Sequence, residues 1–208
     1  MKYKAIIFDL DNTLYAEDEY ITLAYREMGT YLEKEFNYKA SDVSFLLWQI
    51  RRIYGDASVL NKFLQCAGLS NSDEVLRKLI QIYQSVQGSL AVPALVQERL
   101  LELRKMNVPL GILTNGGVKT QENKLKLLNI SHLFDHILIS GTFSNRRLWK
   151  PDIYGYALLA QKFSCEPAAV LFVGDNPKTD EMGARNAGMD FIYAPEFFLE
   201  PVDSLIHS

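Results

Sequence analysis

Cysteine and histidine are scarce in this chain of 208 residues. The two cysteines, Cys66 and Cys165, stand far apart, and neither has a CxxC partner or a neighbouring histidine that would suggest metal or redox chemistry. We therefore expect both thiols to be reduced rather than joined in a disulfide. The histidines have no metal-ligand spacing, and we assign no catalytic role to them: His132, His136 and His207.

Long hydrophobic runs and a dominant charge are also missing. The run Ala5 to Phe8 near the start of the chain is too short for a signal-peptide core or a membrane-spanning segment, so we expect a cytoplasmic protein with no membrane partner. The 22 basic residues stand against 25 acidic ones, for a net charge of −3. Nucleic-acid binding is therefore not expected, because a polyanion requires a basic face. No pattern indicates an oligomeric state.

Short apolar runs recur along the chain, each followed by polar or glycine-rich residues. Runs that are apolar on both faces are typical of parallel strands buried between helices. From about residue 93 onward they alternate with helical patterns, which predicts an α/β fold with a doubly wound, mainly parallel sheet. The expected strands are 5–8, 110–113, 137–139, 169–173 and 191–193, and the expected helices between them are 93–106, 119–128, 151–163 and 178–187.

One interval interrupts this alternation. Between about residues 17 and 87 the sequence contains amphipathic helical patterns and no convincing strand, which predicts an inserted all-α domain. We expect a Rossmann-like core of residues 1–15 and 92–208, and a helical cap domain of residues 16–91. The expected cap helices are 20–36, 41–54, with Ser41 as N-cap, 58–67 and 72–86.

Four short segments of the sequence suggest chemistry. The first two of them follow the first two expected strands. Asp9 and Asp11 lie two residues apart directly after the apolar run, where paired carboxylates repel unless a cation or a proton lies between them. Thr114 and Asn115 precede two glycines, and such a turn lets an anion approach free backbone N–H groups. Taken alone, the first segment is also compatible with a solvated turn, and the second with an ordinary strand-to-helix turn.

The other two segments supply a cation and further carboxylates. Lys150 precedes a proline expected at the first position of a helix, where its charge would assist phosphate binding. Asp175 follows an apolar run and a glycine, as suits a hard divalent cation, and Asp180 would orient Lys150 or a metal-bound water. The simpler readings are a surface lysine and a helix-capping aspartate. Because ligands of open α/β sheets bind beyond the carboxyl ends of the strands, the four segments are expected to converge there.

In combination and in this order, the segments resemble the haloacid dehalogenase-like hydrolase superfamily, in the subgroup with a helical cap after the first motif. The family pattern is Asp-x-Asp-x-Thr, a Thr or Ser after the second core strand, a Lys, and a Gly-Asp-x₄-Asp pair, and the resemblance covers nearly the whole chain. The matching residues here are Asp9, Asp11 and Thr13, then Thr114, Lys150, Asp175 and Asp180.

The resemblance implies a Mg²⁺-dependent phosphatase that acts on small-molecule phosphate monoesters through an aspartyl-phosphate on Asp9. It implies that Asp11 is the general acid and base, and that Mg²⁺ is held by Asp9, Asp175 and the backbone carbonyl of Asp11. Thr114, with the backbone N–H groups around it that include Asn115, and Lys150 would hold the phosphoryl oxygens. Dehalogenases of the superfamily lack the second aspartate, so Asp11 favours phosphate chemistry.

Three other functions remain open at this level. A phosphomutase of the same superfamily would use the same Asp9 and Asp11. A phosphoryl-accepting receiver domain shares the sheet and the acidic site, but places its acceptor on a middle strand and has no helical insert after the first strand. A catalytically silent binding protein need not retain Asp9, Asp11, Thr114, Lys150 and Asp175 together.

The chain departs from the family pattern at two places. Asn12 stands where glycine is common, and asparagine tolerates unusual backbone angles. The approach to Lys150 is bulkier and more basic than usual, and Arg146 and Arg147 there are either solvated or close to an anionic substrate. Candidates for substrate selection, with packing and solvent exposure as the alternative readings, are Tyr15, Trp48, Arg51, Arg52 and Tyr54.

Overall fold

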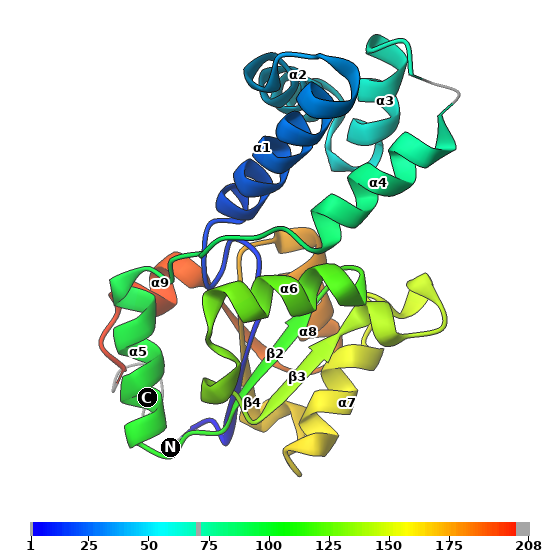
Figure 1. Ribbon diagram of the computed structural model, residues 1–208. Helices are drawn as coiled ribbons and strands as arrows, with labels where there is room; N and C mark the ends of the chain where they lie inside the picture. Colours follow the sequence, from blue (N-terminus) through cyan, green and yellow to red (C-terminus); the bar gives the residue numbers. More distant parts are fainter. Residues whose placement is uncertain (1, 70–71, 203–208) are drawn as a thin grey trace. The chain divides into compact units, whose positions relative to one another are not determined.

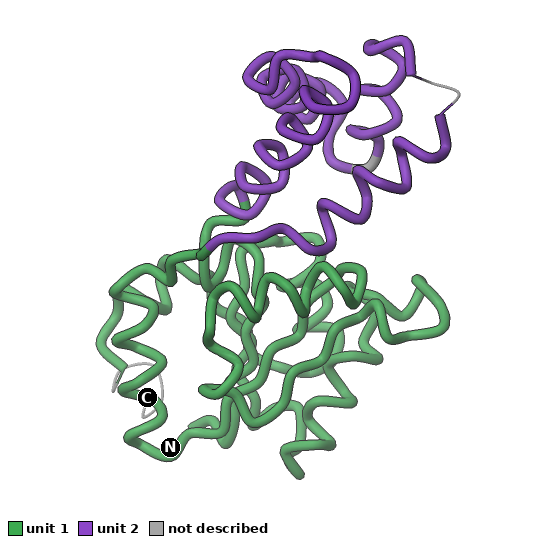
Figure 2. Tube along the Cα trace, in the orientation of Figure 1, with its two compact units in different colours: residues 1–17, 89–208 green, residues 18–88 purple. Residues whose placement is uncertain are grey.

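The computed structural model describes residues 2–69 and 72–202. The chain divides into two compact units, one of residues 1–17 and 89–208 and the other of residues 18–88 (Figure 2). None of the described helices combines the length and the apolar character that crossing a membrane requires. His207 lies outside the described residues.

The first unit contains a parallel five-stranded sheet in the order β3-β2-β1-β4-β5. Three of its strands, β2, β3 and β4, are labelled in Figure 1. Its central strand is the first in the chain, with Ile6 opposite Leu110 on one side and Phe8 opposite Val173 on the other. The prediction of a doubly wound parallel sheet is therefore confirmed. The strands are β1 (Ala5–Phe8), β2 (Leu110–Thr114), β3 (His136–Ile139), β4 (Val170–Gly174) and β5 (Asp190–Tyr193).

Helices cover both faces of this sheet, because successive strand residues point to opposite sides. Ala5 and Ile7 pack in one cluster with Tyr156. Phe8, which faces the other way, contacts the ring of Phe197 at a centroid distance of 5.4 Å. The helices of this unit are α5 (Ala94–Lys105), α6 (Val118–Leu128), α7 (Tyr154–Lys162), α8 (Met182–Asn186) and α9 (Ala194–Leu199).

Two of the predicted helices begin three or four residues later than expected. The helix predicted from residue 151 begins at Tyr154, whose N–H donates to the Asp152 carboxylate, so Pro151 is not at the first helical position. The helix predicted from residue 178 is preceded by a wider turn at Pro177–Glu181 and becomes α-helical only at Met182. In both places a side chain satisfies the backbone before regular helix begins.

The second unit is helical and has its own core. Its helices enclose Met28, Leu32, Leu47, Phe63 and Leu79, all of which are buried. The helices are α1 (Glu17–Phe36), α2 (Ala40–Tyr54), α3 (Val59–Cys66) and α4 (Asp73–Gln84).

Two serine residues at expected helix starts of this unit differ in their roles. Ser72 is the N-cap of α4, and its hydroxyl accepts the N–H of Val75. Ser41 is not the N-cap of α2, because that helix begins at Ala40 and its N-cap position is Lys39.

Helices α1 and α2 approach closely at Gly29. A β-carbon added there would lie 2.6 Å from the backbone oxygen of Ala40, which cannot rotate away. We predict that Gly29→Ala lowers the free energy of unfolding by about 1–3 kcal/mol, as for other overpacked sites. Urea denaturation measures the loss. Gly117→Ala is the matched control, since a β-carbon at Gly117 meets nothing within 4 Å, and equal stabilities of the two variants would contradict the prediction.

Candidate active site

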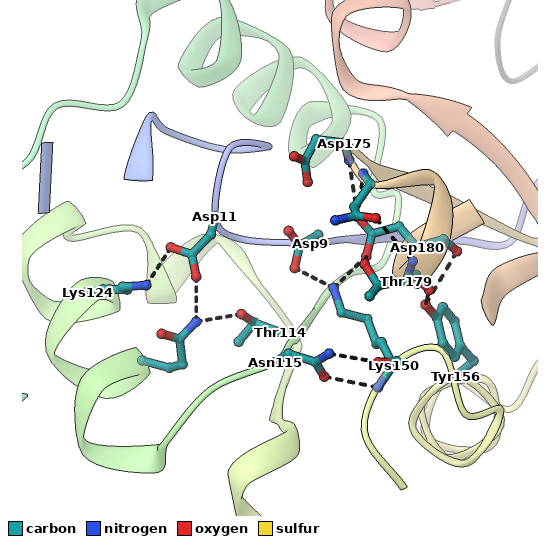
Figure 3. Close-up of polar contacts among 12 residues, drawn as sticks. Asp9, Asp11, Thr114, Asn115, Lys124, Lys150, Tyr156, Asp175, Thr179 and Asp180 are labelled. Carbon is teal, nitrogen blue, oxygen red and sulfur yellow. Dashed lines mark hydrogen bonds and ion pairs between the residues drawn. The ribbon is translucent and has the colours of Figure 1, made fainter. Parts of the chain in front are cut away.

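The candidate residues lie where the strands end at the carboxyl edge of the sheet. Asp9 directly follows β1, and its N–H donates to the Val173 carbonyl at 2.9 Å, which continues the strand pairing by one residue. Thr114 is the last residue of β2, and Asp175 follows β4. Because all these strands are parallel, the three side chains emerge at the same edge, together with Lys150 from the loop before α7 (Figure 3).

Lys150 joins two of the carboxylates. Its ammonium nitrogen, Nζ, lies 2.5 Å from Asp9 Oδ1 and 2.7 Å from Asp180 Oδ1, and all three residues are buried. Burial raises the pKa of Asp9 to about 7; Lys150 opposes this rise, and the carboxylates of Asp180 and Asp11 add to it. Burial lowers the pKa of Lys150, but the two paired carboxylates outweigh it, so the pKa lies above its ordinary value. The lysine therefore stays charged.

Asp180 is hydrogen-bonded to the loop that carries Asp175. Its Oδ2 accepts the backbone N–H groups of Asp175 and Asn176, at 3.2 and 3.1 Å. This arrangement requires glycine at position 174, since a β-carbon there would lie 2.5 Å from Asp180 Oδ2. From the other side, the Tyr156 hydroxyl donates to the carbonyl of Thr179 at 2.8 Å. Asp180 is thus fixed by both side-chain and backbone contacts.

Three carboxylates gather closely enough to bind a metal ion. Asp9, Asp175 and Asp180 each offer one oxygen, and these oxygens all lie within 4.8 Å of one another. Burial raises the pKa of Asp175 to about 6, and the nearby Asp180 carboxylate adds to this rise against the effect of Lys150. Hard oxygen donors that repel one another suit a divalent cation, which would offset their mutual repulsion.

Asp11 has a different set of partners from Asp9. Its Oδ1 accepts from the Tyr15 hydroxyl at 2.6 Å and from Lys124 Nζ at 2.8 Å, and its Oδ2 accepts from Gln121 Nε2 at 2.9 Å. The same Gln121 nitrogen donates to Thr114 Oγ1 at 2.6 Å. The Asp11 carboxylate therefore lies in a separate polar network beside the cluster around Lys150 (Figure 3).

Gln121 and Lys124 are functional candidates that the sequence analysis missed. Both lie on α6 at the spacing of one helical face, which they share with the buried Leu125 and Leu128. That pattern was the available signal: polar residues on the buried stripe of an amphipathic helix need partners inside the protein. Burial lowers the pKa of Lys124, but the carboxylates of Asp11 and Glu17 raise it by more.

The Asn115 side chain binds the backbone of Lys150. Its Nδ2 donates to the Lys150 carbonyl at 2.9 Å, and its Oδ1 accepts the Lys150 N–H at 3.0 Å. This two-point contact fixes the origin of the lysine side chain, so the Asn115 side chain is committed to positioning. The backbone N–H of Asn115 is therefore the group of this residue that could bind an anion.

Several other residues that the sequence analysis singled out make structural contacts or adopt the conformation expected of them. Asn12 adopts a φ of 59°, the left-handed conformation expected of it. His136 packs against the Phe163 ring, and Arg146 lies over the Trp149 ring. Both arginines of the loop before Lys150 are exposed, and within the helical unit Arg51 pairs with Asp18 and Asp56 and lies over the Trp48 ring.

The pairing of Lys150 with two buried carboxylates makes its charge important for stability. We predict that Lys150→Met lowers the free energy of unfolding by about 3–5 kcal/mol, because it leaves buried carboxylates without their cation. Urea denaturation without added metal measures the loss, and combining the substitution with Asp180→Asn should recover part of it. Lys178→Met, at an exposed lysine of the neighbouring loop, is the control. Equal stability of the two single variants would contradict the prediction.

Comparison with known proteins identifies relatives that are named as phosphatases. Among curated proteins, the chain is similar to a glyceraldehyde 3-phosphate phosphatase of Methanocaldococcus jannaschii, with 26% identity over 89% of this chain and 82% of the relative. It is also similar to the pyrophosphatase PpaX of Bacillus velezensis, with 28% identity over 98% of this chain and 94% of the relative. Both relatives carry phosphatase names, in agreement with the predicted phosphohydrolase class.

The fold and the family are recognised as well. The magnesium-bound structure of the HAD-type hydrolase YfnB from Bacillus subtilis matches 97% of this chain and 90% of its own, with a TM-score of 0.69 and 17% identity. The model of the haloacid dehalogenase-like hydrolase family matches residues 6–194. This family match excludes the alternative that the chain is a phosphoryl-accepting receiver domain. The chain belongs to the haloacid dehalogenase-like hydrolase family.

Proposed function

We propose that the protein hydrolyses small-molecule phosphate monoesters, with Asp9 as the nucleophile and Mg²⁺ as the cofactor. The observation that carries this proposal is the position of Asp9, whose buried carboxylate contacts the ammonium of Lys150 at the end of the central strand. A carboxylate attacks an anionic phosphate effectively only where cations offset the repulsion between them. The family membership and the phosphatase names of the relatives support the same chemistry.

The reaction takes place in two steps. In the first, an oxygen of Asp9 forms a bond to phosphorus as the ester bond from phosphorus to the leaving oxygen breaks, which gives an aspartyl-phosphate. Asp11 donates its proton to the leaving alkoxide. In the second step Asp11 takes a proton from a water molecule, which attacks phosphorus. The bond from phosphorus to Asp9 then breaks, and inorganic phosphate leaves.

The phosphoryl oxygens need donors that stay in place while charge moves. Lys150 is fixed from its backbone by Asn115 and from its ammonium by Asp180. The Thr114 hydroxyl is buried and oriented by Gln121. We assign phosphate binding to Thr114, to the backbone N–H of Asn115 and to Lys150, since such donors cost no reorganisation at the moment of reaction.

The metal is assigned to the Asp9 and Asp175 carboxylates with the backbone carbonyl of Asp11. Asp180 is already engaged with Lys150 and with two backbone N–H groups, so we place it outside the ligand shell. When bound, Mg²⁺ supplies positive charge that offsets the repulsion between the carboxylates and the phosphate.

We also propose different roles for the two parts of the chain. Residues 1–15 and 92–208 form the catalytic core, and residues 16–91 form a cap that selects the leaving group. The relatives' names support a small phosphate compound as the substrate.

The experiment is a panel of phosphate monoesters assayed for inorganic phosphate, with Mg²⁺ and after its removal by a chelator. We expect release that requires the metal and that falls on the order of 10³-fold or more in Asp9→Asn, since a nucleophile is lost. Asp42→Asn, which changes an exposed aspartate of α2 in the same way, should keep full activity.

Two outcomes would overturn the assignment. Equal activity of Asp9→Asn and the unchanged protein would remove Asp9 as the nucleophile. Isomerisation of sugar phosphates, with no phosphate released from any ester of the panel, would favour a phosphomutase instead.

A further inference from the structure

Lys124 is a buried lysine that the proposed reaction does not use. It lies in the middle of α6 with 2% of its surface exposed, and its Nζ is 2.8 Å from Asp11 Oδ1 and 3.0 Å from Glu17 Oε1. Removing an ammonium group from water costs several kcal/mol unless carboxylates and hydrogen bonds compensate it. An apolar residue at this point of the helix would avoid that cost. The buried charge therefore requires an explanation beyond the packing of α6.

The contacts of Lys124 are directed at the acid of the reaction. The two oxygens of Asp11 receive three donors, from Lys124 and Tyr15 at Oδ1 and from Gln121 at Oδ2. Because donors contact both oxygens, they fix the direction in which the carboxyl group points and also prevent it from rotating. Two of the three come from one face of α6, so the helix holds the group as a rigid element.

Gln121 also connects this acid to the phosphate-binding residues. Its Nε2 donates to Asp11 Oδ2 and to Thr114 Oγ1, so one amide group sets the spacing between the two. The loop before α6 leaves room for the glutamine side chain only because residue 116 is glycine. A β-carbon at Gly116 would lie 2.8 Å from the Gln121 Cδ atom, and the φ of 150° there also favours glycine.

We propose that Lys124 is a positioning residue for the leaving-group step: it holds the carboxyl group of Asp11, together with Gln121, where that group can hand its proton to the departing oxygen. This inference rests on the proposed function. A general acid must lie within hydrogen-bond reach of the atom it protonates, and a displacement of about 1 Å costs on the order of 10²-fold in rate.

The dependence on the leaving group distinguishes positioning from a purely structural role. An alkoxide leaves poorly without a proton, whereas p-nitrophenolate leaves well without one. The quantity to compare is kcat/KM, which covers the reaction up to transfer of the phosphoryl group to Asp9 and excludes the later hydrolysis. A general loss of folded protein lowers this quantity for both kinds of substrate by the same factor.

The test compares Lys124→Met with the unchanged protein on p-nitrophenyl phosphate and on an alkyl phosphate that the panel shows to be a substrate, such as glycerol 3-phosphate. We expect kcat/KM to fall about 10²-fold for the alkyl ester and at most about threefold for the aryl ester. Lys126→Met, at an exposed lysine two positions along the same helix, should change neither value.

A second variant covers the case in which Lys124→Met does not fold. The double variant Glu17→Gln with Lys124→Met removes one of the two carboxylates that lose their cation, and it should show the same selective loss. In an Asp11→Asn background, Lys124→Met should cause no further change in the alkyl-to-aryl ratio, because the group it positions is gone.

The outcomes separate this inference from the proposed function. Equal losses on both esters, or a further selective loss in the Asp11→Asn background, would overturn the role of Lys124 while Asp9→Asn still abolished activity. A protein whose activity survived Asp9→Asn would overturn the proposed function itself.

Discussion

The site depends on a single ammonium group, that of Lys150, placed between carboxylates that would otherwise repel one another. The parallel sheet brings Asp9 and the loop of Asp175 and Asp180 to one edge, and burial there removes the water that would screen their charges. Lys150 contacts Asp9 and Asp180 at once and is anchored through its backbone by Asn115. With this cation in place, the carboxylates of Asp9, Asp175 and Asp180 lie close together, with one oxygen of each within 4.8 Å of the others.

The sheet and the site segments could be predicted from the sequence because their signals are local. A buried parallel strand is a short apolar run, and the residues after it lie at the same edge of the sheet wherever they occur in the chain. Where local signals conflicted, prediction was less accurate. Pro151 was expected to open a helix, yet the Asp152 carboxylate accepts the N–H of Tyr154 and the helix begins there. No helix was expected after the strand 191–193, yet α9 follows it, and Phe197 and Phe198 of that helix pack against Phe8.

The polar contacts of α6 could not have been predicted in the same way. Lys124 and Asp11 are separated by 113 positions in the chain, and Gln121 and Asp11 by 110. The sequence does not identify the partner of such a lysine, because that partner is a residue far away in the chain. The helical spacing showed that these residues share a face with leucines, but the partner that makes such a position tolerable becomes visible only in the folded chain.

The pairing of Asp11 with Lys124 also constrains how this sequence can change over generations. A neutral residue in place of Asp11 would remove one of the carboxylates that compensate the buried ammonium, and a neutral residue in place of Lys124 would remove the cation that contacts both Asp11 and Glu17. Each single substitution is costly, whereas the double substitution costs much less. The two positions are therefore expected to vary as a pair. A chain related to this one with a neutral residue in place of Asp11 is therefore expected to carry a second change at position 124, on a helix more than a hundred residues away.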